Sequence, residues 1–302
     1  MKIDTLVFSG GSTKVPAFIG AMRALKEKYI LDDKLTGIHH IIVCSVGMFY
    51  GLLLLLGIND RVIEQTVKLF NFSDLLDMDN ININSLLFDL GLFDNHKVAR
   101  VFETILREKY SKETMTMKEL YELTNIKLTA KVCNHTRSCI EYISYENHPE
   151  ATITQVLLMT TAIPLFFKPI KFKGCLYIDG GAAGGFATEI AGENYIGLQL
   201  KGPNKTDKKE TLMDEIPLIN YFIQGLSIAC EDYTKPDNKK IIIPSDIHFT
   251  NFNLTLEDKQ KLIEDGYNYT KEHIEAYELT NDLLKIQPVE DTDPSEEVHV
   301  LE

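Results

Sequence analysis

Several common sequence patterns are missing from this chain of 302 residues. Its five cysteines form no C-x-x-C pair and its eight histidines form no H-x-x-x-H pair, so neither pattern of a metal site is present. Neither G-x-x-x-x-G-K-[ST] nor G-x-G-x-x-G occurs, which argues against the usual nucleotide-binding loops. A positive net charge is also missing, and the value of −13 argues against nucleic acid as a partner. We therefore expect neither a metal nor another cofactor.

A long apolar signal-peptide core is absent after Met1, and the odd number of cysteines favours reduced thiols. Both features predict a cytoplasmic protein. The stretch from Ile41 to Ile58 carries no charge over eighteen residues, which reaches the lower limit for a membrane span. Its β-branched beginning and its glycines favour a buried strand, turn and helix instead, with a membrane span as the alternative.

The composition is that of a globular protein with a sizeable core, at 44% hydrophobic and 25% charged residues. No internal repeat or low-complexity linker divides the chain, so a single domain is expected over residues 1–285. Residues 286–302 hold six acids, two prolines and no Lys or Arg, which predicts an acidic, disordered tail.

Apolar β-branched runs alternate with helical patterns along the chain, and this alternation predicts an α/β fold with a largely parallel sheet. Further strands are expected over 126–132 and 138–145, which should form a hairpin, and over 175–178, 195–200 and 239–243. Helices are expected over 60–70, over 152–161, and from 255 onward, while 71–91 is expected to be an irregular cap.

Helix boundaries are indicated at several places. Phe18, Met22, Leu25 and Tyr29 recur at spacings of three and four, which predicts one apolar helix face. Asn95 is a candidate N-cap for a helix whose apolar face includes 98, 101, 102 and 105, and residues 116–119 match a capping box.

Three segments carry possible chemistry. Ser45 ends a β-rich run and precedes Gly47 and a leucine-rich helix, which is the arrangement of a nucleophile elbow, although on this segment alone a buried strand followed by a core helix is the simpler interpretation. Gly10 and Gly11 follow the first strand, where a glycine-rich turn exposes backbone amides to an anion, although an ordinary strand–helix turn explains them equally well. Asp179 ends a short strand and is followed by two glycines, so it is free to approach another loop.

Together, in this order and spacing, the three segments resemble the patatin-like phospholipases. The resemblance extends to Gly91-Leu92-Phe93-Asp94 before a central helix, to the run from Thr161 to Pro169 beside the family's S-x-A-x-P-x-x-F-x-P, and to the closing helix from Leu254 to Gly266. It covers roughly residues 1–280.

This resemblance implies a three-layer patatin-like α/β hydrolase-type sandwich with a mostly parallel central sheet. It also implies a lipid acyl hydrolase of the phospholipase A type that forms an acyl-enzyme through a Ser-Asp dyad. Ser45 would be the nucleophile and Asp179 the base, with Gly10, Gly11 and Ser12 binding the oxyanion. The substrate would be a phospholipid or another acyl ester, reached by transient contact with a membrane surface.

The chain departs from the family's motifs at five positions: Ser12, Val15, Val43, Gly185 and Ala187. Val43 replaces the first glycine of the elbow, and misplacement of the nucleophile by about 1 Å can cost ~100-fold in rate. Two alternatives therefore stay open, a broader neutral-lipid esterase or transacylase and a catalytically weakened protein that binds lipids or partners.

Basic residues near these motifs have simpler interpretations as well. His39 and His40 lie just before the elbow strand, and a loop or surface role is expected for them. Lys14 falls on the basic position of the family's glycine loop, with a plain surface lysine as the alternative.

Overall fold

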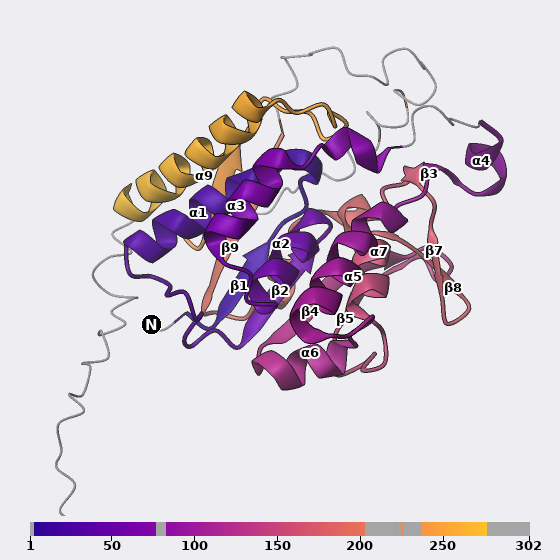
Figure 1. Cartoon of the computed structure of the whole chain (residues 1–302), viewed down its shortest axis with the longest axis horizontal. Helices are drawn as coiled ribbons and strands as arrows, with labels where there is room; N and C mark the ends of the chain where they lie inside the picture. The colour runs from indigo at the N-terminus through magenta and orange to yellow at the C-terminus, as the bar shows by residue number, and fades with distance from the viewer. Residues whose placement is uncertain (1–2, 77–82, 203–220, 222–224, 226–236, 277–302) are drawn as a thin grey trace, which may run out of the picture.

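The computed structural model describes residues 3–76, 83–202, 221, 225 and 237–276 (Figure 1). The tail expected over 286–302 lies outside these described residues. The expected α/β fold with a mostly parallel central sheet is confirmed.

Within the described residues, the central sheet has eight strands in the order β10-β9-β1-β2-β4-β8-β7, with β5 also paired to β4. The strands are β1 (Thr5–Phe8), β2 (His40–Cys44), β4 (Lys127–Asn134), β5 (Cys139–Ile143), β7 (Ile170–Phe172), β8 (Cys175–Asp179), β9 (Tyr195–Lys201) and β10 (Lys240–Pro244). Neighbours from β10 to β4 pair in parallel, whereas β4–β5, β4–β8 and β7–β8 are antiparallel. The predicted hairpin is the β4–β5 pair.

Both faces of the central strands are covered. Leu6 and Phe8 of β1 belong to the large core beneath the helices, whereas Val7 points to a smaller cluster with Phe186 and Ala187. Strands buried on both sides read as continuous apolar runs, which explains the sequence of β1 and β2. Among the described residues, the segment after Asp179 therefore packs on the second face of the sheet.

The helices pack against this sheet (Figure 1). They are α1 (Pro16–Glu27), α2 (Val46–Leu55), α3 (Asp60–Leu69), α4 (Ile83–Phe88), α5 (His96–Tyr110), α6 (Met117–Thr124), α7 (Ile153–Thr160) and α9 (Leu256–Ala276). α1 and α9 cross at two glycines. A Cβ on Gly20 would overlap the carbonyl oxygen of Ile263, and a Cβ on Gly266 would overlap that of Ala17.

One expected helix detail is wrong and two are confirmed. Tyr29 lies beyond the end of α1 at a positive φ of 56° and is 77% exposed. Asn95 is the N-cap residue of α5, as expected, although its Nδ2 donates to Leu158 O at 3.0 Å and its side chain makes no capping hydrogen bond. The capping box at Thr116 is present, with both of its hydrogen bonds.

Some elements were not expected. The segment expected as an irregular cap contains α4, and β3 (Gly91–Phe93) pairs in parallel with β6 (Leu165–Phe167) as a second sheet. The uncharged run 41–58 contains β2 and α2 rather than one long helix. Within the described ranges no helix combines the length and hydrophobicity that a membrane crossing requires.

Candidate active site

Ser45 lies at the sharp turn between β2 and α2. Its backbone has a φ of 51° and a ψ of −125°, a conformation that non-glycine residues rarely adopt and that costs roughly 1–3 kcal/mol. Gly47 makes the turn possible, because a Cβ there would lie 2.5 Å from Phe8 O and 2.8 Å from Ser9 O. The predicted elbow is therefore built on a close crossing of α2 and the end of β1.

Val43, the departure from the elbow motif, packs against a glycine. Its side chain is fully buried, and a Cβ added to Gly51 of α2 would lie 3.1 Å from Val43 Cγ1. The missing side chain at Gly51 thus leaves the space that the valine fills. The Val43 side chain can therefore be accommodated without a distortion of the turn at Ser45.

We expect Val43→Gly to destabilise the fold by roughly 2–4 kcal/mol without faster acylation, because it leaves a cavity against Gly51. The double variant Val43→Gly/Gly51→Ala should regain part of this loss, since the new methyl group fills the space. Urea unfolding of the two single variants and the double variant measures this coupling. Additive effects would contradict the packing described here.

Asp179 meets Ser45 at the end of β8. Ser45 Oγ donates to Asp179 Oδ2 at 2.6 Å, and the amide of Gly181 donates to Oδ1 at 2.6 Å. Both side chains are buried, with 6% and 4% of their surfaces exposed. Burial raises the pKa of Asp179 to about 6, while the two hydrogen bonds act in the opposite direction. The carboxylate is thus a stronger base than an exposed aspartate.

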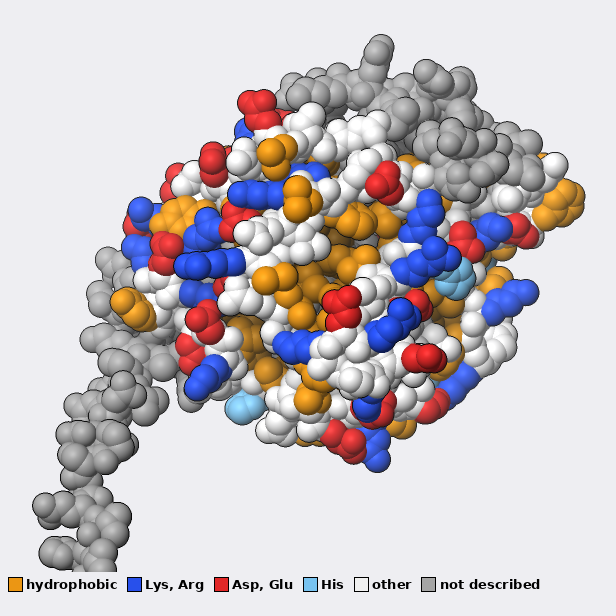
Figure 2. Space-filling model, in the orientation of Figure 1, with side chains coloured by type: hydrophobic (Ala, Val, Ile, Leu, Met, Phe, Trp, Pro, Cys, Tyr) orange, Lys and Arg blue, Asp and Glu red, His pale blue; other side chains and the backbone are white. Residues whose placement is uncertain are grey.

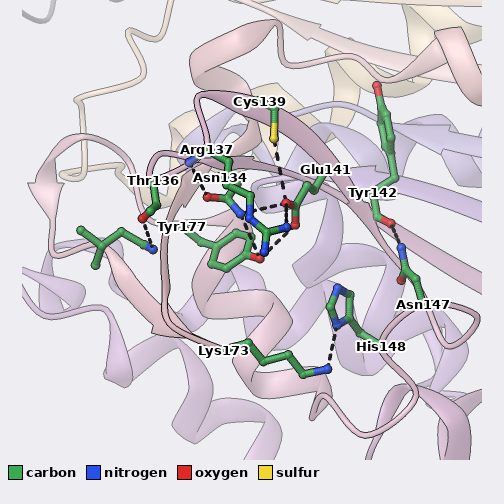
Figure 3. A network of polar contacts seen from close by, with 11 residues as sticks. Asn134, Thr136, Arg137, Cys139, Glu141, Tyr142, Asn147, His148, Lys173 and Tyr177 are labelled. Carbon is green, nitrogen blue, oxygen red and sulfur yellow. Dashed lines mark hydrogen bonds and ion pairs between the residues drawn. The ribbon is translucent and has the colours of Figure 1, made fainter.

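A polar network holds β8 in place (Figure 3). Glu141 of β5 accepts from Asn134 Nδ2 at 2.8 Å and from Tyr177 OH at 2.9 Å. Tyr177 lies two residues before Asp179 on the same strand. The hairpin therefore fixes the strand that presents the carboxylate.

Thr160 is a site residue that the sequence analysis missed. Its Oγ1 accepts from the Ser45 amide at 2.9 Å and donates to Lys131 O at 2.7 Å. Thr160 occupies the first position of the family's S-x-A-x-P pattern, where the family has a hydroxyl-bearing serine. It lies one residue before the run from Thr161 to Pro169 in which the resemblance to that pattern was found. That position was the signal that could have identified it.

The glycine turn lies directly against Ser45. A Cβ on Gly10 would be 3.2 Å from Ser45 Cβ, and Ser12 has a φ of 53°, the left-handed conformation that suits the family's glycine. The amide of Gly10 donates to Gly185 O at 2.8 Å, so it is already engaged. The amides of Gly11 and Ser12 have no acceptor among the described residues. Of the three predicted oxyanion donors, these two are available.

Lys14 is buried rather than a plain surface lysine. Only 3% of its surface is exposed, and its Nζ donates to Ile247 O at 3.4 Å. Its neighbour Thr13 donates through Oγ1 to Asn251 O at 2.8 Å. Burial lowers the pKa of Lys14 to about 8. Together the two side chains attach the glycine turn to the loop after β10.

The expected loop or surface role is wrong for His40. This residue begins β2, is half-buried, and shares a hydrogen bond of 2.8 Å with Thr129 Oγ1. Burial lowers the pKa of His40 to about 4, so the ring is neutral at physiological pH.

Among the described residues, no group of three or more His, Cys, Asp or Glu side chains is placed to hold a metal ion.

A cavity of about 610 Å³, including its open mouth, begins at Ser45. Its polar side chains are Ser12, Thr13, Ser45 and Thr161, and the other lining residues are apolar. These are Val15, Val46, Phe49, Phe70, Phe72, Leu75, Val98, Val101, Ile163, Phe167 and Phe252. Among the described residues that line it, none carries a charged side chain, which suits a hydrocarbon chain.

The chain is similar in sequence to a known family and to two viral proteins. The family model of the patatin-like phospholipases matches residues 6–191. The probable lipid hydrolase 463L of Invertebrate iridescent virus 6 is 28% identical over 260 residues, covering 85% of this chain and 83% of that protein. The protein R571 of Acanthamoeba polyphaga mimivirus is 24% identical and covers 90% of this chain and 94% of its own length.

Solved structures share the fold at low sequence identity. VipD from Legionella pneumophila has a TM-score of 0.67 at 16% identity, covering 91% of this chain and 67% of that one. Full-length ExoU from Pseudomonas aeruginosa has a TM-score of 0.51 at 16% identity, and the match spans about half of that chain, 52%. With a family match over more than half of its length, and with this fold, the chain belongs to the patatin-like phospholipase family.

Proposed function

We propose that this protein is a lipid acyl hydrolase of the phospholipase A type that works through a Ser45–Asp179 dyad. The family and the viral lipid hydrolase support hydrolysis of lipid esters. The hydrogen bond of 2.6 Å between Ser45 Oγ and Asp179 Oδ2, at the base of an apolar cavity, is the observation that carries the proposal.

In the proposed reaction, Asp179 accepts the proton of Ser45 as Oγ attacks the ester carbonyl carbon. The amides of Gly11 and Ser12 donate to the oxyanion of the tetrahedral intermediate. The protonated Asp179 then passes its proton to the departing alcohol, which leaves an acyl-Ser45 ester. Water, activated by the same carboxylate, attacks this ester and releases the fatty acid.

Two features support this assignment of roles. Thr160 holds the backbone of Ser45 through its amide, and Asp179 orients the Ser45 hydroxyl. Asp179 lies where burial makes its ionised form reactive, since the raised pKa increases its affinity for a proton.

Neutral lipids form the second candidate substrate class. The described lining of the cavity contains no Lys or Arg that would favour a phosphate group. A phospholipid would therefore be selected by its acyl chain, and its head group would stay outside with the membrane surface.

Release of fatty acid tests the proposal. Wild type and Ser45→Ala are incubated with phosphatidylcholine vesicles and, separately, with a triacylglycerol emulsion. Release from the vesicles that disappears in Ser45→Ala supports a phospholipase. Release from the emulsion alone favours the neutral-lipid esterase, and no release from either favours a protein that only binds lipids.

The pH dependence is a further expected result. Because Asp179 must be ionised to accept the proton, kcat/KM for an uncharged ester should fall about tenfold per pH unit below pH ~6. Above that pH the carboxylate is already ionised and the rate should level off. A rate that stays constant down to pH ~4 would contradict the role of Asp179 as the base, because it would match an ordinary exposed carboxylate.

A further inference from the structure

Helices α2 and α5 run side by side in the same direction. Phe49 and Phe102 meet edge to face with ring centroids 5.0 Å apart. Further along both helices, Tyr110 OH donates to Leu56 O at 2.9 Å. The second contact lies nearer the C-terminal end of both helices than the first. We call the line along which the two helices meet, from Ser45 to Leu56, the α2–α5 seam.

The cavity at Ser45 opens into the first turns of this seam. Val46 and Phe49 line it from α2, and Val98 and Val101 line it from α5. All four side chains are apolar, so an acyl group on Ser45 enters the seam without meeting a polar side chain from either helix.

The next turn of each helix continues the same surface. Leu53 follows Phe49 by four residues, and Ile105 follows Val101 by four, so each lies on the same side of its helix. Ile105 is only partly buried, as are Val101 and Phe49. In Figure 2, hydrophobic side chains gather in a hollow in the middle of this face, where Figure 1 places α2 between α3 and α5.

Polar groups close the far end of the seam. Lys109 Nζ donates to Leu56 O at 2.7 Å and to Gly57 O at 2.6 Å, beside the bond from Tyr110. The helical rise from Ser45 to Leu56 is roughly 16 Å, which is the length of on the order of a dozen methylene groups. An apolar chain thus meets a defined end.

We propose that the acyl chain of the substrate lies along the α2–α5 seam, and that Ile105 and Tyr110 limit its length. This inference rests on the acyl hydrolase function proposed above. A path of this kind makes the protein selective for long-chain acyl esters. Each methylene group that moves from water into the seam adds favourable free energy of binding. A chain shorter than one helical turn would not reach Ile105.

Chain-length selectivity tests this path. kcat/KM is measured for p-nitrophenyl esters of butanoic, octanoic, dodecanoic and hexadecanoic acid with wild type, Ile105→Trp and Thr104→Trp. Thr104 is exposed and lies about 100° around α5 from Ile105, so Thr104→Trp is the matched control for an added indole. Thermal melts show whether each variant folds, and Ile105→Phe is used instead if Ile105→Trp does not.

For wild type we expect kcat/KM to rise with chain length. In the Ile105 variant, the ratio of hexadecanoyl to butanoyl kcat/KM should fall at least tenfold, while Thr104→Trp should keep the wild-type ratio. An unchanged ratio in a folded Ile105 variant, or an equal fall in Thr104→Trp, would overturn the path along the seam but leave the hydrolase in place. No Ser45-dependent turnover of any ester by the wild type would overturn the proposed function and this inference with it.

Discussion

Asp179→Asn is expected to lower turnover of lipid esters by roughly 10³–10⁴-fold, because an amide cannot accept the proton of Ser45. The same variant should be more stable than wild type at pH 8. Burial raises the pKa of Asp179 to about 6 in the folded protein, compared with about 3.9 in an unfolded chain. Turnover and the free energy of unfolding, measured on one preparation, should therefore move in opposite directions.

The sign of the stability effect follows from proton linkage. Between pH ~4 and ~6 the folded protein keeps the Asp179 proton that the unfolded chain has lost, so stability falls as pH rises through this window. Above it the ionised carboxylate costs up to about 3 kcal/mol, which a neutral asparagine avoids. The gain should vanish below pH ~4, where both states are protonated.

Ser45→Ala is the matched control. It should remove turnover to a similar extent but give no such gain, because it leaves Asp179 buried without the hydroxyl that donates to it. A variant Asp179→Asn with near-wild-type turnover and an unchanged fold would contradict the dyad.

Gly266→Ala is expected to destabilise the protein by about 3 kcal/mol, although alanine is the better helix former by about 1 kcal/mol. The added methyl group would overlap the carbonyl oxygen of Ala17, which belongs to the backbone of α1 and cannot rotate away. Helices α1 and α9 would have to move apart to make room for it. The two helices lie together over the sheet near β9 and β10. Thermal unfolding should show a fall in Tm of roughly 5–10 °C.

Asn268→Ala separates the two effects in the same helix. Asn268 is exposed two residues further along α9, so its replacement changes helix propensity without changing packing. It should leave stability unchanged or raise it by a few tenths of a kcal/mol. A gain for Gly266→Ala as well would show that α1 and α9 are not in close contact.

Sequence periodicity predicted much of the fold, for identifiable reasons. β1 and β2 are buried on both faces, and such strands leave continuous apolar runs in the sequence. The capping box at Thr116 was found because both of its hydrogen bonds join residues three positions apart. Signals of this kind are local, so they can be read without the tertiary structure.

The features that were missed depend on distant partners. β3 and β6 have three residues each, and only their pairing across about seventy positions identifies them. Thr160 acts on Ser45 through a bond that spans 115 positions. The packing of Val43 also depends on a distant partner, because Gly51, on the next helix, leaves room for its side chain.

Labelling by a fluorophosphonate probe tests the central claim, that Ser45 is a nucleophile activated by Asp179. The probe is incubated with wild type, Ser45→Ala and Asp179→Asn, and the adduct is located by mass spectrometry. We expect one adduct on Ser45 of the wild type, none in Ser45→Ala, and labelling of Asp179→Asn that is slower by at least about 100-fold. An adduct on a different serine, or equal rates for wild type and Asp179→Asn, would contradict the account.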